Sequence, residues 1–510
     1  MRILMLGWEF PPFVSGGLGT ACYGLTKALA ARGAEITFVL PKVTGQDYHE
    51  HVRLLAPQAP EAAKGERSPD AVASTYRVDT TSPAPVQQPP PPQVQPDAHP
   101  APHDPGLENV TFRAVPSRIA SPYRPALPEP DRTGRIARGV PSRPPVPSGT
   151  PTPAPAQEQI SFFANAEGGD DYGGDLLSET RRYADLVLDL AEGVEFDAVH
   201  AHDWLTFPAA QAVAARHGKP MVAHVHSTEY DRSGDQPHHA LVEIERAGVA
   251  AADRVIAVSH LTRRMLETRY GCDPAKIRVV YNGLENGTIE SRINAPNPKP
   301  IRKTDKIVLF LGRITMQKGP EYFVAAAKRV LECVSDVKFV MAGSGDQVRR
   351  VIELAAEYGI GDRVLFTGFL RGEDVARVFQ MADVYVMPSV SEPFGIAPLE
   401  AISHDVPVII SKTSGVSEVL EHVLKVDFWD IDEMANKIAA VLKYPPLGVT
   451  MRSHADLEAS RLTWDSAAER CDAVYDELTG AAPETPAKVD PTATAGSQDA
   501  GGPAVAPSVN

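Results

Sequence analysis

Short apolar runs alternate with segments of helical periodicity along most of the chain. Strands buried on both faces of a parallel sheet read as continuous apolar runs, so we interpret these runs as parallel strands. In the first half the predicted strands are residues 2–7, 35–40, 196–201, 220–226, 253–258 and 277–281. In the second half they are residues 306–311, 337–342, 364–367, 384–387 and 406–410. Helical segments between many of these runs predict an α/β protein with two doubly wound, Rossmann-like sheets.

Two stretches lack this pattern, residues 57–157 and residues 480–510. The first contains the run Pro89 to Pro92 and is rich in Pro, Ala, Gln and Ser. Such sequence buries too little apolar surface to offset its loss of conformational entropy, so we expect a disordered insertion and a disordered tail. A short run at residues 109–115 is expected to form one strand within the insertion.

These breaks predict the domain organisation. We expect an N-terminal Rossmann-like domain over residues 1–285 that carries the Pro-rich insertion, and a polar hinge over residues 286–305. A second Rossmann-like domain is expected over residues 306–463, followed by a helix over residues 464–479. The PxxP spacings of the insertion suit a partner that binds polyproline II, and an inert spacer is the alternative.

Composition excludes several classes of function. The formal net charge of −15 argues against non-specific binding to nucleic acid or to an anionic membrane. The cysteines Cys22, Cys272, Cys333 and Cys471 lie far apart without zinc or redox spacing, which predicts reduced thiols. No apolar stretch is long enough to span a membrane or to form a signal sequence. We therefore expect a cytoplasmic protein.

The segment from Ser389 to Glu400 carries the first candidate chemistry. It follows the strand 384–387, and Pro393 and Gly395 break regular structure before a helix begins. Open α/β sheets bind ligands at such strand ends, and the N–H groups of a helix N-terminus suit phosphate or sugar oxygens. Glu392 would lie in the loop and Glu400 on the helix. The alternative is two ordinary surface carboxylates.

Two other strand ends carry compatible residues. Gly16 and Gly17 precede a helix, where glycines let a ligand approach the backbone, although a plain tight turn explains them equally well. No GK[ST] follows, so this is not a P-loop. Arg313 and Lys318 flank the loop after strand 306–311, and a planar guanidinium and a compact ammonium both suit a diphosphate. Two solvated cations are the alternative.

Four histidines lie at two further strand ends. His200 and His202 close one strand and His224 and His226 the next, and alternate residues of a strand share a face. A zinc site is conceivable from these residue types, but no set in the sequence completes a ligand geometry. We expect core or hydrogen-bonded histidines and no metal site.

The motifs together resemble those of retaining GT-B glycosyltransferases of the GT4/GT5 group. The segment from Glu392 to Glu400 is similar to the E-x7-E motif of that family, and the segment 312–319 to its GR…KG motif. The loop at residues 16–19 and the sequence HAHDW at residues 200–204 are similar to segments of glycogen and starch synthases. Residues 281–285 and 414–418 resemble its PNG and GG-x-x-E turns. The likeness extends over the chain outside the insertion and the tail.

The resemblance implies a role for each matching residue. Arg313 and Lys318 would hold the donor diphosphate. Glu392 would hold hydroxyls of the donor sugar and Glu400 the ribose. His226 and Asp203 would lie at the sugar. The other residues expected in the donor site are Gly16, Gly17, Phe394, Gly395 and Ile396. The residues expected to act in catalysis are Glu392, Arg313, Lys318 and His226. The helix over residues 464–479 would cross back to the first domain.

The implied reaction is metal-independent and retaining, with no cofactor and a nucleotide-diphosphate sugar as substrate. The first expectation is a glucosyl transfer to an α-glucan, as in glycogen synthase. Val14 stands where these synthases usually carry Lys, which favours broader GT4 relatives over an ADP-glucose enzyme. A GT4 transferase with a small sugar or sugar-phosphate acceptor is the alternative, and a non-catalytic nucleotide-sugar sensor is another. A phosphorylase is disfavoured because no cofactor-lysine segment is present. The sequence leaves the donor base and the oligomeric state open.

Overall fold

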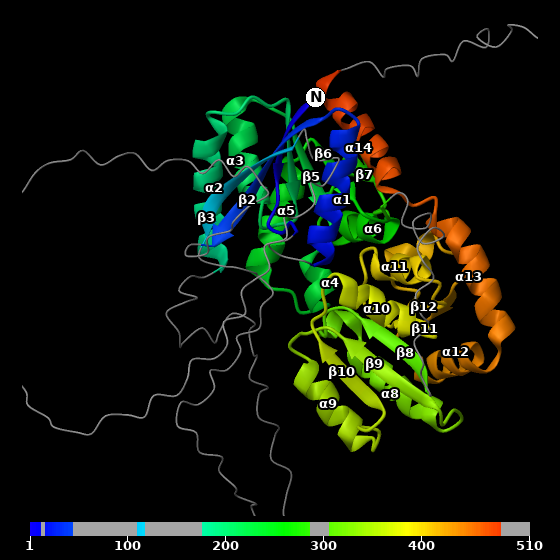
Figure 1. The fold of residues 1–510 in the computed structure, drawn as a ribbon. Coiled ribbons are helices and arrows are strands. Elements are labelled where there is room, and N and C mark those ends of the chain that lie inside the picture. Colours follow the sequence, from blue (N-terminus) through cyan, green and yellow to red (C-terminus); the bar gives the residue numbers. More distant parts are fainter. Residues whose placement is uncertain (12–15, 44–109, 118–175, 286–304, 481–510) are drawn as a thin grey trace, which may run out of the picture.

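The computed structural model describes residues 1–11, 16–43, 110–117, 176–285 and 305–480 (Figure 1). These residues form two parallel sheets, of seven and six strands, each with helices against its faces. The predicted fold class is confirmed. Most of the Pro-rich insertion, the predicted hinge and the tail lie outside the described residues.

The first sheet has the order β3-β2-β1-β4-β5-β6-β7. Its strands are β1 Arg2–Leu6, β2 Glu35–Val43, β3 Val110–Ser117, β4 Ala198–His202, β5 Met221–Val225, β6 Arg254–Ala257 and β7 Ile277–Val279. The strand expected at 109–115 is confirmed, because β3 pairs in parallel with β2 at the edge of the sheet. The insertion therefore contributes one strand to the first sheet.

Helices cover both faces of the first sheet. They are α1 Gly17–Ala31, α2 Leu176–Ala191, α3 Phe207–His217, α4 Glu229–Ser233, α5 His239–Ala251 and α6 His260–Arg269, with a short 3-10 turn at Pro274–Lys276. Helices α2, α3, α5 and α6 pack on the face that carries Leu4 and Leu6. Helix α5 was not predicted, because a buried carboxylate, Glu245, interrupts its apolar stripe.

The second sheet has the order β10-β9-β8-β11-β12-β13. Its strands are β8 Lys306–Leu311, β9 Val337–Ala342, β10 Val364–Gly368, β11 Val384–Met387, β12 Val408–Ser411 and β13 Leu424–Val426. The helices around it are α8 Pro320–Leu331, α9 Val348–Glu357, α10 Glu373–Met381, α11 Ala397–Ser403, α12 Ile431–Lys443 and α13 Pro445–Ala459. Two 3-10 turns, η2 Met316–Lys318 and η3 Gly415–Glu418, complete it. Helix α13 was not predicted because it begins with two prolines, which a first turn tolerates.

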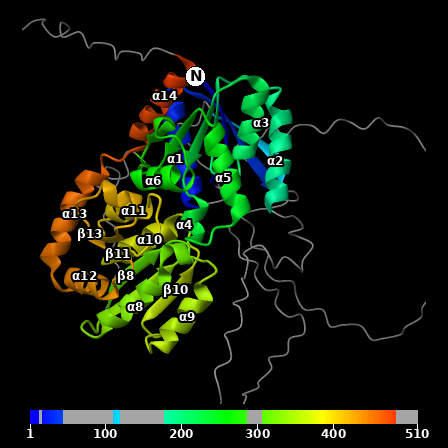
Figure 2. The same ribbon diagram turned by 180° about the vertical axis from the view of Figure 1, so that it is seen from behind.

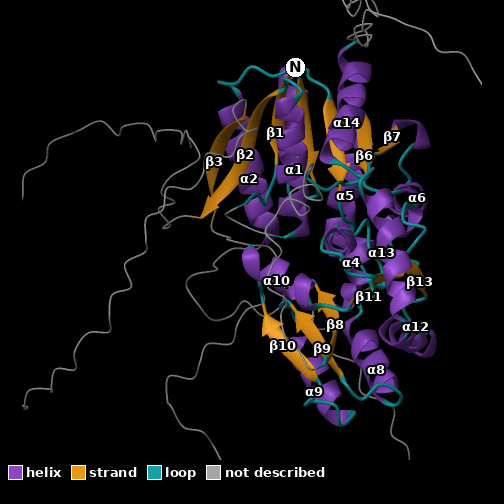
Figure 3. Ribbon diagram, turned by 45° about the vertical axis from the view of Figure 1, so that its right-hand side comes forward, coloured by secondary structure: helices purple, strands orange, loops and turns teal. Residues whose placement is uncertain are grey.

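The last described helix, α14 Trp464–Thr479, leaves the second sheet and packs beside α1 on the first (Figures 2 and 3). Trp464 and Tyr475 join the apolar layer that also contains Ile3 and Met5 of β1. Gly24 lets the two helices approach, since a Cβ there would lie 2.2 Å from the Trp464 indole. None of the described helices has both the length and the apolar character needed to cross a membrane.

Candidate active site

The carboxyl ends of the two sheets face each other, and loops from both meet there. The Ser391 hydroxyl, in the loop after β11, donates to Asp231 Oδ1 of α4 over 2.6 Å. The Ser259 hydroxyl, before α6, donates to the Pro393 carbonyl over 2.5 Å. The Glu418 carboxylate accepts the first backbone N–H groups of α6 from across the interface. Loops that follow strands of both sheets therefore meet in one region.

Lys318 and Glu392 are in direct contact. Lys318 ends η2, and its Nζ lies 2.5 Å from Glu392 Oε2, which also accepts from the Ser389 hydroxyl over 3.1 Å. Glu392 is only 6% exposed. Gly319 follows with φ +66°, and a Cβ there would lie 2.1 Å from the Pro388 carbonyl oxygen. The turn after β8 and the loop after β11 are thus packed backbone to backbone, which fixes the Lys318–Glu392 pair.

Glu9 is a residue of this region that the sequence did not single out. It is 2% exposed, and burial raises the pKa of its carboxyl to about 7, while Arg313 and the Gly19 N–H act in the opposite direction. A Cβ on Gly16 would lie 2.7 Å from Glu9 Oε2, whereas one on Gly17 would meet nothing within 4 Å. Gly16 is therefore needed for the approach of Glu9, and the space beside Gly17 is open. An acidic residue in the loop between the first strand and the first helix, seven positions before Gly16, was the available signal.

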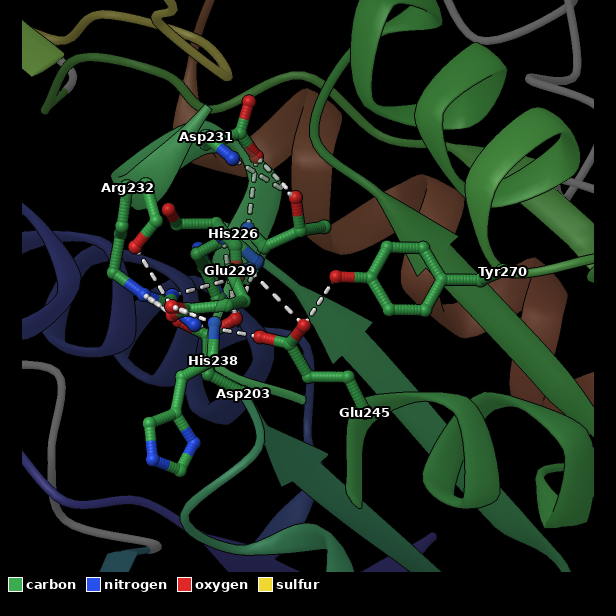
Figure 4. A network of polar contacts seen from close by, with 11 residues as sticks. Asp203, His226, Glu229, Asp231, Arg232, His238, Glu245 and Tyr270 are labelled. Atoms are coloured by element: carbon green, nitrogen blue, oxygen red, sulfur yellow. Dashed lines mark hydrogen bonds and ion pairs between the residues drawn. The ribbon is translucent and has the colours of Figure 1, made fainter. Parts of the chain in front are cut away.

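Asp203 holds the loop that carries His226 (Figure 4). Its Oδ1 accepts the backbone N–H of His226 over 2.7 Å and that of Ser227 over 3.3 Å. Burial raises the pKa of Asp203 to about 7, and those two N–H donors and Arg232 oppose the rise. Asp203 also has φ 60°, a conformation that costs a non-glycine residue free energy. The carboxylate expected beside the sugar is engaged with the protein backbone through this oxygen.

A buried ionic network braces α4 behind this loop (Figure 4). Arg232 contacts Glu229 at 3.1 Å and Glu245 at 2.6 Å, and it donates to the Ser227 carbonyl. Glu245 also accepts from the Tyr270 hydroxyl, and burial raises the pKa of Glu245 against the effect of Arg232. Because each carboxylate has several donors, the network is satisfied and rigid. The sequence did not identify it.

The remaining residues of the expected donor site surround the start of α11. Glu400 lies in its first turn, and burial raises the pKa of this carboxyl. Gly395 has φ +103° and leaves its Cβ position 3.2 Å from Glu392 Cγ. Ile396 is half-buried. The Phe394 ring is buried near Tyr281, and the Phe394 carbonyl accepts the Val416 N–H.

The four histidines gather on one face of β4 and β5. Ring nitrogens of His200, His202 and His224 all lie within 4.8 Å of one another, close enough to be considered as metal ligands. Both ring nitrogens of His200 are already engaged, one with the Tyr475 hydroxyl at 2.6 Å and one with His224 at 3.1 Å. The Nε2 atoms of His202 and His224 have no partner among the described residues, but a metal held by all three rings would have to displace one of the two hydrogen bonds of His200. The geometry favours a hydrogen-bonded cluster.

Comparison with known proteins identifies the family. The model "Glycosyl transferases group 1" matches residues 291–457, "Glycosyltransferase Family 4" residues 164–286, and "Starch synthase catalytic domain" residues 2–81. An uncharacterized glycosyltransferase of Methanocaldococcus jannaschii is 33% identical over 45% of this chain and 60% of its own length. A D-inositol 3-phosphate glycosyltransferase of Acidothermus cellulolyticus is 30% identical over 55% of this chain and 67% of its own length. The chain belongs to the GT4 group of glycosyltransferases.

Solved structures agree with this GT4 assignment at the level of the fold. Sucrose-phosphate synthase from Thermosynechococcus elongatus superposes with a TM-score of 0.60 at 19% identity, covering 94% of this chain and 100% of that one. Anabaena HepE in complex with UDP and glucose superposes with a TM-score of 0.58 at 16% identity and the same coverage. The GT4 chain therefore has the GT-B fold expected from its sequence.

Proposed function

We propose that this GT4 glycosyltransferase moves a hexosyl group, with retention, from a nucleotide-diphosphate sugar to a small hydroxyl-bearing acceptor such as a polyol or sugar phosphate. The observation that carries the catalytic part is the buried Lys318–Glu392 pair, which is fixed by the packing of Gly319 on Pro388. The acceptor class rests on the relatives, several of which are D-inositol 3-phosphate glycosyltransferases. The comparisons favour this class over the α-glucan that was the first expectation.

The donor would be activated through its leaving group. Negative charge grows on the β-phosphate oxygen as the bond to the sugar breaks, and preorganised cations stabilise it best where water is excluded. Lys318 is 20% exposed and held by Glu392, and Arg313 follows β8 in the same loop. Both are positioned to approach a diphosphate at this sheet edge. Because two cations can supply this charge, the proposed reaction is metal-independent.

Glu392 and His226 would orient the sugar. Glu392 keeps a second carboxylate oxygen beyond the one held by Lys318 and Ser389, and a carboxylate oxygen accepts from sugar hydroxyls. Burial lowers the pKa of His226 to about 3, so its ring is neutral near pH 7 and is not a general acid. We therefore propose front-face attack in which the leaving phosphate takes the acceptor proton. A covalent glycosyl adduct on Glu392 would contradict this route.

We also propose that the chain closes around the donor as two bodies, residues 1–285 with α14 and residues 306–463. The described residues next to the two crossings lie side by side. The Leu284 N–H donates to the Leu462 carbonyl, and the Trp464 N–H donates to the Leu284 carbonyl. A Cβ on Gly283 would lie 2.3 Å from the Thr463 backbone, so residues 283–284 and 462–464 are in contact. Such a narrow double connection suits rotation of one body against the other.

The test is nucleotide release by the purified chain. UDP-glucose, ADP-glucose, GDP-mannose and UDP-GlcNAc are each offered with inositol 3-phosphate, a hexose 6-phosphate, free inositol or a maltodextrin. We expect release that depends on one small acceptor and is lost in Lys318→Ala and Glu392→Ala. The matched control is Lys443→Ala, which removes an exposed lysine at the end of α12.

Two outcomes would overturn parts of this proposal. Release that depends on maltodextrin alone would restore the α-glucan acceptor. Thermal stabilisation by a donor without turnover over all acceptors would support a nucleotide-sugar sensor instead. NMR of the product anomer decides between retention and inversion.

A further inference from the structure

Four imidazoles, three of them buried, form two hydrogen-bonded layers between the first sheet and α14. Strands β4 and β5 are parallel, with His202 opposite His224, so alternate residues on both strands point to one face. In the deep layer, His200 Nε2 lies 3.1 Å from His224 Nδ1, and Tyr475 of α14 closes the layer at His200 Nδ1. In the layer nearer the strand ends, His202 Nδ1 lies 2.9 Å from His226 Nε2.

His226 is held twice by consecutive residues at the end of β4. Asp203 accepts its backbone N–H over 2.7 Å, and His202 contacts its ring. His202 is completely buried, while His226 is partly exposed. Because Nε2 of His226 is turned inward to His202, Nδ1 is the ring nitrogen left to face a ligand at the sheet edge. The ring of His202 lies nearly parallel to that of Phe38, with the ring centroids 6.3 Å apart.

The burial of the cluster fixes its protonation. Burial lowers the pKa of His200 to about 3 and those of His202 and His224 well below the ordinary range, so all four rings are neutral near pH 7. A hydrogen bond between two neutral imidazoles needs one N–H and one bare nitrogen. The His202–His226 contact therefore has a direction.

The unpartnered nitrogen of His202 indicates that direction. Its Nε2 is buried and has no hydrogen-bond partner among the described residues. Buried N–H groups without a partner are rarer than under-satisfied acceptors. The bare nitrogen of His202 is therefore Nε2, and the proton is on Nδ1, from which it is donated to His226 Nε2. His226 then carries its own proton on Nδ1, towards the ligand side.

We propose that His202 is a positioning residue for the glycosyl transfer, which sets the tautomer and the ring orientation of His226 so that His226 presents an Nδ1–H donor to the donor sugar. This inference rests on the proposed function for its catalytic meaning. His202 touches no substrate and acts through His226. Tyr475, His200 and His224 form the hydrogen-bonded layer beneath, and neither His200 nor Tyr475 contacts the ring of His226 through a hydrogen bond.

Substitutions separate this role from a structural one. His202→Phe removes the donor, and His202→Asn keeps an amide N–H close to the position of Nδ1. His200→Phe is the matched control, because it removes an equally buried imidazole from the cluster without touching the ring of His226. We expect both Phe variants to lower the thermal midpoint. His202→Phe should also lower kcat on the order of 100-fold, with a smaller change in the donor KM. His202→Asn should retain much of the wild-type kcat. Equal kcat losses in the two Phe variants would overturn the proposal.

Tautomers are read directly by NMR of the full chain labelled with ¹⁵N-histidine. The signals of His202 and His226 are assigned by their loss in His202→Asn and His226→Asn. We expect a proton on Nδ1 and a bare Nε2 in both rings of the wild type. A proton on His226 Nε2 would overturn the inference. The NMR measurement of the tautomers needs no turnover. If the chain used none of the offered donors, the proposed function would be refuted, but the tautomers of His202 and His226 could still be determined.

Discussion

Lys318 Nζ lies 2.5 Å from Glu392 Oε2, so the cation and the carboxylate expected to hold different parts of the donor are paired with each other. A diphosphate that binds Lys318 must share or replace this contact. The pair therefore keeps a partly buried ammonium compensated until an anion arrives. Its two members come from loops after different strands, β8 and β11.

Removal of either member leaves the other charge uncompensated, which gives the first prediction. Lys318→Ala and Glu392→Gln should each lower kcat/KM by about 100-fold or more, because each loses an interaction with the reacting groups. The double variant should be little worse than either single variant, since the two side chains act as a unit. Steady-state kinetics of the three variants measures this. Multiplicative losses would show instead that Lys318 and Glu392 act independently.

Gly319 should be irreplaceable for a reason other than its left-handed backbone. Its φ is +66°, and a Cβ would collide with the Pro388 carbonyl oxygen at 2.1 Å. Gly271 has φ +67° with nothing within 4 Å, and it is the matched control. We expect Gly271→Ala to cost about 1 kcal/mol of stability with normal turnover. Gly319→Ala should cost more and lower kcat/KM at least about tenfold, because the neighbouring Lys318 moves.

Chemical denaturation and turnover of the two alanine variants test this. Equal behaviour of Gly271→Ala and Gly319→Ala would mean that the loop after β11 yields to the new methyl group.

The contact between Ser391 and Asp231 joins the two halves and should affect donor binding. Its 2.6 Å hydrogen bond links the loop of Glu392 to α4. Ser391→Ala should raise the donor KM by roughly 3- to 10-fold. A factor of this size corresponds to the net free energy of about one hydrogen bond, because water replaces part of the lost interaction. The radius of gyration of the Ser391→Ala variant, measured by small-angle scattering, should be slightly larger than that of the wild type, because one contact between the two halves is lost. The exposed Ser453→Ala on α13 is the control, and an unchanged KM in Ser391→Ala would assign the contact to packing alone.

Glu9 gives a prediction about pH and stability. Burial raises its pKa to about 7, so the folded protein keeps a proton that the unfolded chain releases at about pH 4. The unfolded state binds fewer protons in this window, and the contribution of Glu9 therefore makes the free energy of unfolding fall as pH rises from about 4 to about 7. Glu9→Gln cannot ionise. It should gain stability relative to the wild type across this window, by up to about 3 kcal/mol.

Urea denaturation at a series of pH values measures the difference between the two proteins, in which contributions shared by both cancel. Glu35→Gln, at an exposed position of β2, is the matched control variant and is measured in the same series. A difference for Glu9→Gln that also stays flat with pH would mean that Glu9 has the same pKa in the folded and the unfolded chain.

The sequence predicted the structure well where a short segment has a regular pattern of apolar residues. Strand runs such as 306–311 and 384–387 are continuous and apolar, and the structure has strands at those residues. The sequence was uninformative where polar residues are buried together. The sequence assigned no role to Glu229, Arg232 and Glu245, and in the structure Glu229 and Glu245 are buried and both contact Arg232. Glu229 and Arg232 share α4, but Glu245 lies on α5, and periodicity within one segment carries no signal of that contact.

The same limit applies to the site itself. The sequence placed Lys318 and Glu392 at two strand ends, and their position at one sheet edge follows from the topology. The pairing of Ser391 with Asp231 spans 160 residues and depends on how the halves meet. The direction of the His202 hydrogen bond depends on burial and on a nitrogen without a partner. None of these relations is a property of a short segment.

Helix α14 belongs to the first sheet in space and to the end of the described chain in sequence. Trp464 and Tyr475 fill the layer against β1, and Tyr475 closes the histidine cluster. Residues 1–285 therefore leave the ribosome well before α14, the helix that completes their apolar core, has been synthesised. The second sheet is contiguous in the chain and has all of its strands when residue 426 emerges. During synthesis the first half begins earlier and is finished last, and its apolar face stays exposed to chaperones and to aggregation until the final helix arrives.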